Sequence, residues 1–362
     1  MSAFHDSAAG PAPVIAIPHR KVIRTWLRQL PGRSTALALG LVALDLSLFV
    51  AAIAATVLLR AVPLKLVAAA LGGLCIARLF ILGHDACHQS FTPRRRLNAW
   101  IGRLVFLPSL TPYSLWDVGH NVVHHGYTNL RGFDMVWQPL AADEYLALPD
   151  WRKALYRAYR SGWAPWLYYL VEIWWLRMFF PRTRYMPSRR RVFVMDGLLV
   201  SAAAVCWIAL LAWAAHATAQ RLWLIELSGF VLPLLVWCAF IGFVVYVHHT
   251  HADIAWHADK AAWAAAQPFV STTVHLRFRP FLGIDMDAVL HHIMQHTAHH
   301  VDMSIPLYRL PRAQAILEEK MPGRIVVQTF SWRWYFDTAR RCKLYDYGRG
   351  SWTGFDGRPG GG

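Results

Sequence analysis

The sequence predicts an all-α integral membrane protein with four transmembrane helices arranged in two hairpins. The first observation is composition, because 56% of the 362 residues are hydrophobic and only 16% are charged, whereas soluble domains carry about 25% charged residues. The second observation is that the apolar residues gather in four long stretches. Each stretch has at least the length of about 20 residues that crosses a bilayer. The chain is therefore expected to lie partly in lipid.

The four apolar stretches are joined in pairs. They cover residues 35–59, 62–83, 192–216 and 222–247. Arg60 and Ala61 separate the first two, and residues 217–221 join the last two. Connections as short as these make consecutive helices antiparallel neighbours, so each pair is expected to form a hairpin.

This pattern divides the chain into six parts. They are a cytosolic N-terminal segment 1–34, a first transmembrane hairpin 35–83, a cytosolic or interfacial segment 84–191, a second hairpin 192–248, a cytosolic cap 249–352 and a Gly-rich tail 353–362. Within the third part, residues 166–180 are rich in Trp, Tyr and Phe. They suit either a helix lying in the bilayer interface or an aromatic belt that flanks the spans.

Lysine and arginine set the expected orientation. Of the 37 Lys and Arg residues, 33 lie outside the hairpins and 3 lie at the hairpin tips. Cytosolic loops of membrane proteins carry the excess of basic residues, so both termini and the active segments between the spans are expected on the cytosolic side. The net charge of +16 then suits an anionic membrane surface, and nucleic acid is not expected as a partner.

Histidines concentrate beside the predicted spans. The chain has 18, and 13 of them lie in four short windows: His84 and His88; His120, His124 and His125; His248, His249 and His251; and His291, His292, His296, His299 and His300. The orientation above puts all four windows on the cytosolic side. There they can converge beneath the helix ends, although they are far apart in the sequence.

The spacing within the windows suits metal binding. Residues three or four apart share one face of an α-helix, so His84 and His88 are expected to point the same way. The same relation is expected for His120 with His124, and for His296 with His299 and His300. Imidazole suits zinc, copper, iron and nickel, and structural zinc takes four ligands, often with Cys. At least eight grouped histidines therefore predict a helical cap that encloses a di-metal centre.

Carboxylates and amides near the windows are expected to support the ligands rather than to bind metal. Asp85 and Asp302 lie off the repeated histidine face, where a carboxylate can accept the free imidazole N–H and fix the ring. Asn121, with Asp117 and Asn129, is a further candidate for this part.

The residues around the windows resemble those of the membrane fatty acid desaturases. Residues 83–91, Gly-His-Asp-Ala-Cys-His-Gln-Ser-Phe, resemble the first histidine box of that family, HDxxH. Residues 111–129 are similar to its second box with both flanks, and residues 296–310 resemble its third box with the IPxYxL tail. The resemblance runs from about residue 75 to residue 310, and the flanks look most like the acyl-lipid branch of the Δ12 or ω-6 type.

The resemblance implies that the box histidines bind two iron ions. Those implied as ligands are His84, His88, His120, His124, His125, His296, His299 and His300. His249 is the implied ninth ligand, with His248 and His251 left open because His248 replaces the family's usual Gln. His292 is a further candidate. The second box reads HxxxHH here, where HxxHH is the commoner spacing of the family.

The reaction implied by the resemblance is insertion of a cis double bond into a lipid-linked acyl chain, with dioxygen as co-substrate. No side chain is basic enough to take hydrogen from an unactivated methylene, so a metal cofactor must carry that chemistry. A hydroxylase or ketolase acting on an alkane, sterol or carotenoid is the alternative, and a metal- or haem-binding membrane protein is a more distant one. The acyl chain, the carbon attacked, the acyl carrier and the oligomeric state do not follow from the sequence.

Electrons for this reaction must come from another protein. The chain carries no HPGG cytochrome b5 motif. Arg94, Arg95 and Arg96 closely follow the first histidine box. They can hold anionic headgroups, worth about 1 kcal/mol for each residue near the surface, or dock an acidic protein through charge. A ferredoxin or a cytochrome b5-like protein is the expected donor at this patch.

Overall fold

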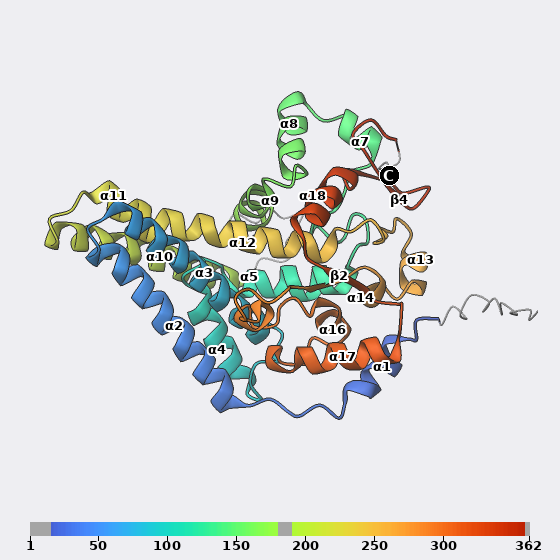
Figure 1. Cartoon of the computed structure of the whole chain (residues 1–362), viewed down its shortest axis with the longest axis horizontal. Helices are drawn as coiled ribbons and strands as arrows, with labels where there is room; N and C mark the ends of the chain where they lie inside the picture. The colour runs from blue at the N-terminus through green and yellow to red at the C-terminus, as the bar shows by residue number, and fades with distance from the viewer. Residues whose placement is uncertain (1–15, 180–189, 359–362) are drawn as a thin grey trace, which may run out of the picture.

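Figure 1 shows the computed structural model, which describes residues 16–179 and 190–358. Residues 1–15 of the expected N-terminal segment and residues 359–362 of the expected Gly-rich tail lie outside the described residues, as do residues 180–189. The membrane-type helices extend to one side of the molecule, and the shorter elements gather at the other side.

The described residues are mostly helical. The elements up to the second half of the chain are α1 (Arg20–Leu27), α2 (Thr35–Leu58), α3 (Val62–Cys87), α4 (Arg95–Phe106), α5 (Tyr113–Asp117), the π-helix η1 (Val118–His124), α6 (His125–Tyr127), α7 (Ala142–Leu146), α8 (Asp150–Tyr159), α9 (Pro165–Tyr168) and the π-helix η2 (Tyr169–Phe179). The second half contains α10 (Arg191–Ala217), α11 (Leu222–Glu226), the π-helix η3 (Leu227–Val231), α12 (Leu232–His249), α13 (Lys260–Ala265), α14 (Pro268–Ser271), β1 (Val274–Arg277), α15 (Met286–Val289), α16 (His296–Val301), the 3-10 helix η4 (Leu307–Arg309), α17 (Leu310–Lys320), β2 (Val326–Thr329), α18 (Trp332–Arg341), β3 (Leu344–Asp346) and β4 (Ser351–Thr353).

Four helices in the described part of the chain are long and apolar enough to cross a membrane, as the sequence predicted. They are α2, α3, α10 and the continuous helix Leu222–His249 that α11, η3 and α12 form. Helix α3 continues four residues past the expected end of its apolar stretch, to Cys87. This extension carries His84 on its last turn, so a histidine window begins on the same rigid element that forms the span.

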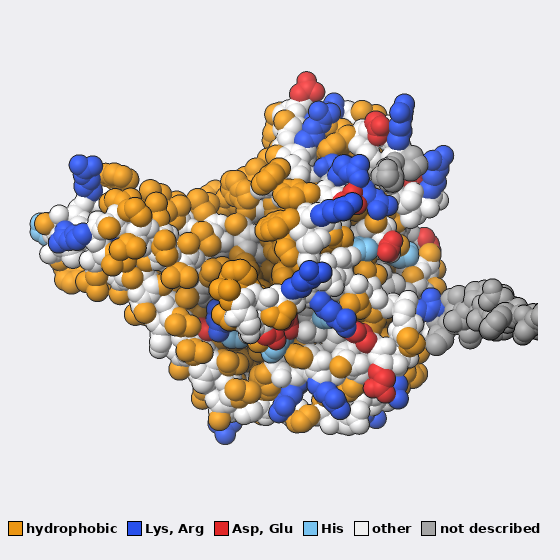
Figure 2. Space-filling view, viewed as in Figure 1, with side chains coloured by type: hydrophobic (Ala, Val, Ile, Leu, Met, Phe, Trp, Pro, Cys, Tyr) orange, Lys and Arg blue, Asp and Glu red, His pale blue; other side chains and the backbone are white. Residues whose placement is uncertain are grey.

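Helix α3 is the central helix of this group, with α2 and α12 packed against it. Gly73 permits a close approach to α12, because a Cβ at this position would lie 2.7 Å from the carbonyl oxygen of Pro233. Helices α2 and α10 instead leave most of their apolar side chains exposed. Figure 2 shows hydrophobic side chains covering the arm that these helices form, with Lys and Arg at its tip and over the opposite end of the molecule. The arm thus has the apolar surface of a membrane-embedded part.

The expectation of an all-α chain is wrong in one respect, because two short sheets are present. Strand β1 pairs in parallel with β2, with Val274 opposite Val326. Strands β3 and β4 form an antiparallel pair. Val and Thr favour extended backbone because their branched side chains suit a pleated surface. The β1–β2 pairing ties the segment before the fourth histidine window to the C-terminal part.

The aromatic-rich segment at residues 166–180 is helical throughout its described part, in α9 and η2. Residue 180 lies outside the described residues. The segment packs along α12, and Tyr169 and Ile173 are buried there. One side of this segment therefore packs into the core beside the histidine windows.

A buried ionic contact joins the transmembrane helices to the segment before α16. The Nη2 atom of Arg78 on α3 donates to Asp45 Oδ1 on α2 at 2.6 Å. The Nε2 atom of His291 lies 2.5 Å from the other oxygen of the same carboxylate, and Asp45 is fully buried. Buried charges are stable when they are paired and hydrogen-bonded. This pairing accounts for the ionisable residue that the sequence places within the first span.

Candidate metal centre

Nine histidines come together in two groups beside the ends of α3 and α12. The ligating nitrogens within each group all lie within 4.8 Å of one another. The five-histidine cluster contains His84, His88, His120, His125 and His299. The four-histidine cluster contains His124, His249, His296 and His300. These are the eight box histidines and the ninth candidate that the sequence singled out.

The five-histidine cluster turns its Nε2 atoms inward. The Nε2 atom of His84 lies 3.3 Å from that of His88 and 3.0 Å from that of His120. The Nε2 atom of His125 lies 3.1 Å from those of His120 and His299. At metal–nitrogen bonds of about 2.1 Å, nitrogens at right angles around one metal are separated by about 3.0 Å. The spacing therefore fits imidazoles that share a metal ion.

The four-histidine cluster draws on elements that are widely separated in the chain. The Nε2 atom of His296 on α16 lies 2.8 Å from that of His249, the last residue of α12. The rings of His124 and His300 have centroids 5.1 Å apart. The Nε2 atom of His300 is buried without a hydrogen-bond partner. Buried nitrogens are normally satisfied, so this unpaired atom is consistent with a centre that a metal completes.

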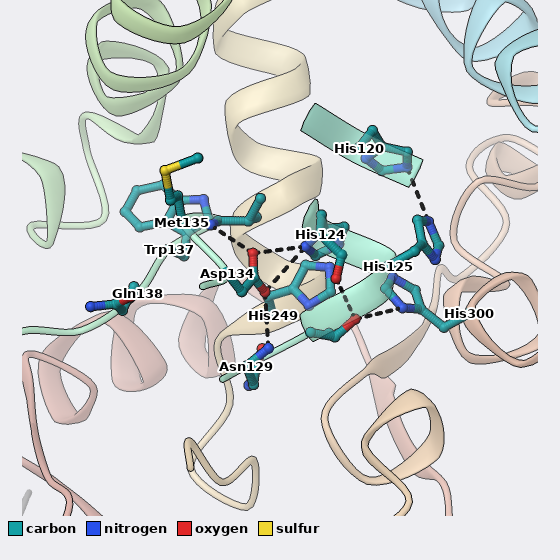
Figure 3. Close-up of polar contacts among 12 residues, drawn as sticks. His120, His124, His125, Asn129, Asp134, Met135, Trp137, Gln138, His249 and His300 are labelled. Atoms are coloured by element: carbon teal, nitrogen blue, oxygen red, sulfur yellow. Dashed lines mark hydrogen bonds and ion pairs between the residues drawn. The ribbon is translucent and has the colours of Figure 1, made fainter. Parts of the chain in front are cut away.

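A carboxylate supports one ring of the four-histidine cluster. The two oxygens of Asp134 lie 3.1 and 3.2 Å from the Nδ1 atom of His124, as Figure 3 shows. Asp134 is fully buried and also accepts hydrogen bonds from the backbone N–H groups of Asn129 and Val136. A carboxylate on Nδ1 fixes the ring orientation and leaves Nε2 for a metal. The Thr128 hydroxyl lies 3.4 Å from His300 Nδ1 and can orient that ring.

The second histidine box is split between the clusters because its backbone is a π-helix. In a π-helix the hydrogen bonds join residues five apart, and the N–H of His125 bonds the carbonyl of His120. These two rings therefore meet in the five-histidine cluster, while His124 turns to the other cluster. The expectation that His120 and His124 point the same way is wrong, because it assumed an α-helix and the backbone here is a π-helix. The extra residue of the HxxxHH spacing is accommodated by this wider turn.

Helix α16 also divides its histidines between the two clusters. His296 and His300 are four residues apart and share one face, in the four-histidine cluster. His299 points to the five-histidine cluster, because adjacent residues on an α-helix lie about one quarter of a turn apart. The expectation that all three point the same way is wrong for His299. The doublet His299-His300 thus serves both clusters.

Burial keeps these imidazoles neutral. Desolvation lowers the pKa of His88, His120, His125, His296, His299 and His300 well below the ordinary value, and neighbouring imidazoles lower it further. Metal ligation requires the unprotonated ring. These six rings are therefore in the protonation state that a metal needs at neutral pH.

The remaining histidines of the windows have other contacts. His292 lies outside both clusters, with its Nδ1 atom 2.9 Å from Asp287. His248 stacks on His296 with 3.9 Å between ring centroids, and its Nε2 atom faces the sulfur of Met294. His251 reaches Gln328. Of the three candidates at the end of the last span, only His249 lies in a cluster.

The polar residues that the sequence proposed as supports lie elsewhere. Asp85 accepts hydrogen bonds from Ser90 and from the N–H of Leu307. Asn121 donates to the carbonyl of Cys87, and Asp302 accepts from Ser304. The sequence reasoning missed Asp134, which follows His124 by ten residues in a loop where no helical periodicity applies.

An apolar cavity opens directly onto the metal-binding rings. Histidines of both clusters line it, among them His84, His124 and His249. The rest of its wall is mainly hydrophobic and comes from α3, η2 and α12. Trp116 narrows it near the centre by stacking on His120, at 4.1 Å between centroids. The arrangement can place a long apolar group beside the rings of both histidine clusters.

Comparison with known proteins gives the class of this centre. Residues 59–332 match the fatty acid desaturase family model. The chain is 30% identical to an sn-1 oleoyl-lipid 12-desaturase of Arthrospira platensis over 72% of this chain and 70% of that protein. It is 29% identical to a chloroplastic omega-6 fatty acid desaturase of Brassica napus, over 76% of this chain and 58% of that protein. An sn-1 acyl-lipid omega-3 desaturase (ferredoxin) of Synechocystis is 29% identical over 65% of this chain and 62% of its own length.

The chain belongs to the fatty acid desaturase family. It is an oxidoreductase with a histidine-rich metal centre, and its four apolar helices make it a membrane protein. The resemblance seen in the three histidine boxes is confirmed by these matches.

Proposed function

We propose that the protein inserts a cis double bond at the Δ12 position of a lipid-linked acyl chain, using dioxygen and two iron ions. The observation that carries this proposal is the apolar cavity lined by both histidine clusters. Two of the relatives are named as desaturases of this regiochemistry, an oleoyl-lipid 12-desaturase and an omega-6 desaturase. Phospholipid or another glycerolipid is the proposed carrier of the acyl chain.

The nine clustered histidines are the proposed iron ligands. When bound, the iron pair supplies the activation of dioxygen that removal of hydrogen from a methylene requires. The residues of the chain hold the rings neutral, orient them and exclude water. Asp134 fixes His124 through its Nδ1 atom, and burial of the remaining rings prevents protonation from competing with the metal. His292 is not included in the proposed ligand set, because Asp287 binds its ring outside the clusters.

The apolar wall is proposed to position the acyl chain. Phe80 on α3, Ile173 on η2 and Val244 on α12 line the cavity from three sides. Burying each methylene of an acyl chain is worth about 0.8 kcal/mol, so an extended apolar wall can hold a long chain in one register. The methylenes that lie beside the histidines are then the ones that react.

The proposed membrane arrangement has two hairpins with the metal centre and both termini in the cytosol. Helices α3 and α12 both end at the histidine clusters, at Cys87 and His249, so they cross in the same direction. Two spans that end on one side support an arrangement in which residues 84–191 and 249–352 share that side. Cysteines placed at the exposed positions Arg95 and Arg312 should label from the cytosol, and one at Ala219 from the opposite side.

The function is tested by expressing the chain in a host that makes oleoyl lipids but no polyunsaturated lipids. The expected result is a new 9,12-diene in the membrane lipids, detected by gas chromatography with mass spectrometry. The His299→Ala variant serves as control and should yield none. A hydroxylated or keto product, or no new acyl product from well-expressed protein, would contradict the proposal.

The proposed electron donor is an acidic carrier, a ferredoxin or cytochrome b5-like protein, that docks on Arg94–Arg96. These three residues are exposed at the start of α4. Cations at a helix N-terminus are disfavoured by the helix dipole, so the three arginines destabilise α4. Binding to a partner is the proposed reason for their presence. One of the relatives is named with ferredoxin, which supports a small acidic carrier. The patch follows His88, a residue of the five-histidine cluster, by six residues in the sequence.

A further inference from the structure

A second cavity adjoins the apolar one and has a different character. It lies between α8, η2 and the loop of residues 132–148, and it shares Val123, Met135 and Arg177 with the wall of the apolar cavity. The loop has two faces. Figure 3 shows Asp134 turned toward His124 and Gln138 turned away from the histidines. Met135, between them, belongs to both cavities, so the two spaces meet at this residue.

The wall of the second cavity combines apolar side chains with several polar and charged groups. Arg152 on α8 forms an ion pair with Glu172 on η2 at 2.9 Å, and the Tyr159 hydroxyl donates to the same carboxylate at 3.2 Å. The Glu172 side chain is only 15% exposed. Four tyrosines in all line the space, which gives aromatic faces and hydroxyl groups. Because these polar groups are paired with one another, their burial is tolerated, and they present a polar surface to a ligand with its own hydrogen-bonding groups.

Among the residues that the structure describes, the charges of this wall are balanced. Its lining contains two arginines, Arg152 and Arg177, and two glutamates, Glu144 and Glu172. A coenzyme A thioester carries several phosphate charges and needs an excess of cations, as phosphate recognition generally does. A wall of balanced charge and tyrosine hydroxyls instead suits a head that is zwitterionic or uncharged and rich in oxygen.

Three large apolar side chains are exposed on or beside the elements that form the cavity. Leu146 on α7, Trp151 on α8 and Trp163 before α9 are 67%, 66% and 76% exposed. Exposed Trp is typical of the boundary between bilayer and water. Their position on the elements that form the cavity places its mouth within reach of lipid headgroups, not only of soluble acyl carriers.

From these observations we propose that the second cavity is the head-group site for a zwitterionic or uncharged glycerolipid. The glycerol and head would lie against Tyr159 and Glu172, and the acyl chain would pass Met135 into the apolar cavity. This inference rests on the proposed function, since it assigns the acyl chain to that cavity. It adds a place in the fold, the second cavity, for the head of the proposed glycerolipid.

The test introduces a bulky side chain into the second cavity, at a position outside the histidine clusters. Leu148 lines the cavity, whereas Leu146 is two residues away and outside its lining. Leu148→Trp and Leu146→Trp therefore form a matched pair. Binding of radiolabelled dioleoylphosphatidylcholine, methyl oleate and oleoyl-CoA is measured on the purified full-length protein in detergent. Unchanged iron content and melting temperature confirm that each variant is folded.

The expected result is selective for the glycerolipid. Leu148→Trp should raise the dissociation constant of the phosphatidylcholine at least about tenfold, equal to about 1.4 kcal/mol, and leave methyl oleate binding unchanged, while Leu146→Trp changes neither. Unchanged phosphatidylcholine binding, an equal loss of both ligands, or tighter binding of oleoyl-CoA than of phosphatidylcholine by the wild type would overturn the head-group site. Failure of methyl oleate to bind the wild type would overturn the acyl-chain cavity of the proposed function, and the head-group site with it.

Discussion

The two histidine clusters are built differently although they lie side by side. The five-histidine cluster takes four of its rings from residues 84–125 and only His299 from the C-terminal part. The four-histidine cluster takes only His124 from that region, and His249, His296 and His300 from the second half of the chain. One cluster is thus mainly local, and the other depends on contacts across the whole fold.

The clusters also differ in their polar support. Among the described residues, no carboxylate contacts a ring of the five-histidine cluster, whose rings face one another through their Nε2 atoms. In the four-histidine cluster Asp134 holds His124. A carboxylate raises the basicity of the ring it holds. The comparison teaches that two adjacent metals can have unequal electronic surroundings in a centre made only of imidazoles.

Adjacent residues on α16 test both clusters at once. His299→Ala removes a ring from the five-histidine cluster, and His300→Ala removes one from the four-histidine cluster. Mutation of a residue that only supports a metal ligand lowers metal affinity or activity by about 10- to 100-fold. Loss of a ligand itself should therefore lower desaturation by on the order of 100-fold or more. The measurement is diene formation in membranes with equal amounts of each variant. Full activity of either variant would remove that ring from the centre.

Asp134→Asn should weaken metal binding in the four-histidine cluster and leave the five-histidine cluster unaffected. The neutral amide keeps the shape of the side chain but weakens the hold on His124, so affinity for one of the two irons should fall by about 10- to 100-fold. The amount of iron that stays bound during incubation with a chelator measures this affinity. Asp302→Asn is the matched control, because Asp302 contacts Ser304 and Arg24 rather than a histidine. Equal iron retention by the two variants would contradict the role of Asp134.

Low pH should destabilise the metal-free protein through both clusters. Burial lowers the pKa of His88, His299 and His300 in the folded state, whereas unfolding restores an ordinary value of about 6.5. The unfolded chain therefore binds more protons below this pH, and stability falls as the pH drops through it. Thermal melting of the iron-free protein between pH 8 and pH 5 checks this, and a melting temperature that rises toward pH 5 would contradict it.

The smallest expected effect concerns the arginine patch at the start of α4. Changing Arg94, Arg95 and Arg96 together to Gln should slow turnover severalfold with a protein donor, because charge steers such docking. Turnover with a small chemical reductant should not change. The difference between wild type and variant should also shrink as salt screens the charges. Equal losses with both electron sources would exclude the patch as a donor site.

Much of this architecture follows from the sequence, because it depends on local signals. Apolar stretches of sufficient length predicted the four long helices, and four-residue spacing predicted that His84 and His88 meet on α3. Both signals lie within a single helix, whose presence and buried face are determined by the length and periodicity of its apolar pattern. Three histidine boxes in order also predicted the family.

The pairing of the rings could not be predicted, because it depends on backbone geometry that spacing does not reveal. The π-helical turn sends His120 with His125 and sends His124 to the other cluster. Asp134 reaches His124 from a loop, and Asp45 holds His291 across the chain. Contacts of this kind arise only when the elements pack, so residue type alone pointed to Asp85 and Asp302 instead.

The central claim is that the two clusters each hold one metal ion in the same protein. The most direct measurement is the iron content of purified, active wild-type protein, by elemental analysis per chain. We expect two irons per chain in the wild type, and a loss of iron in both His299→Ala and His300→Ala. Active protein with a single iron per chain, or iron content unchanged in both variants, would contradict the two-cluster account.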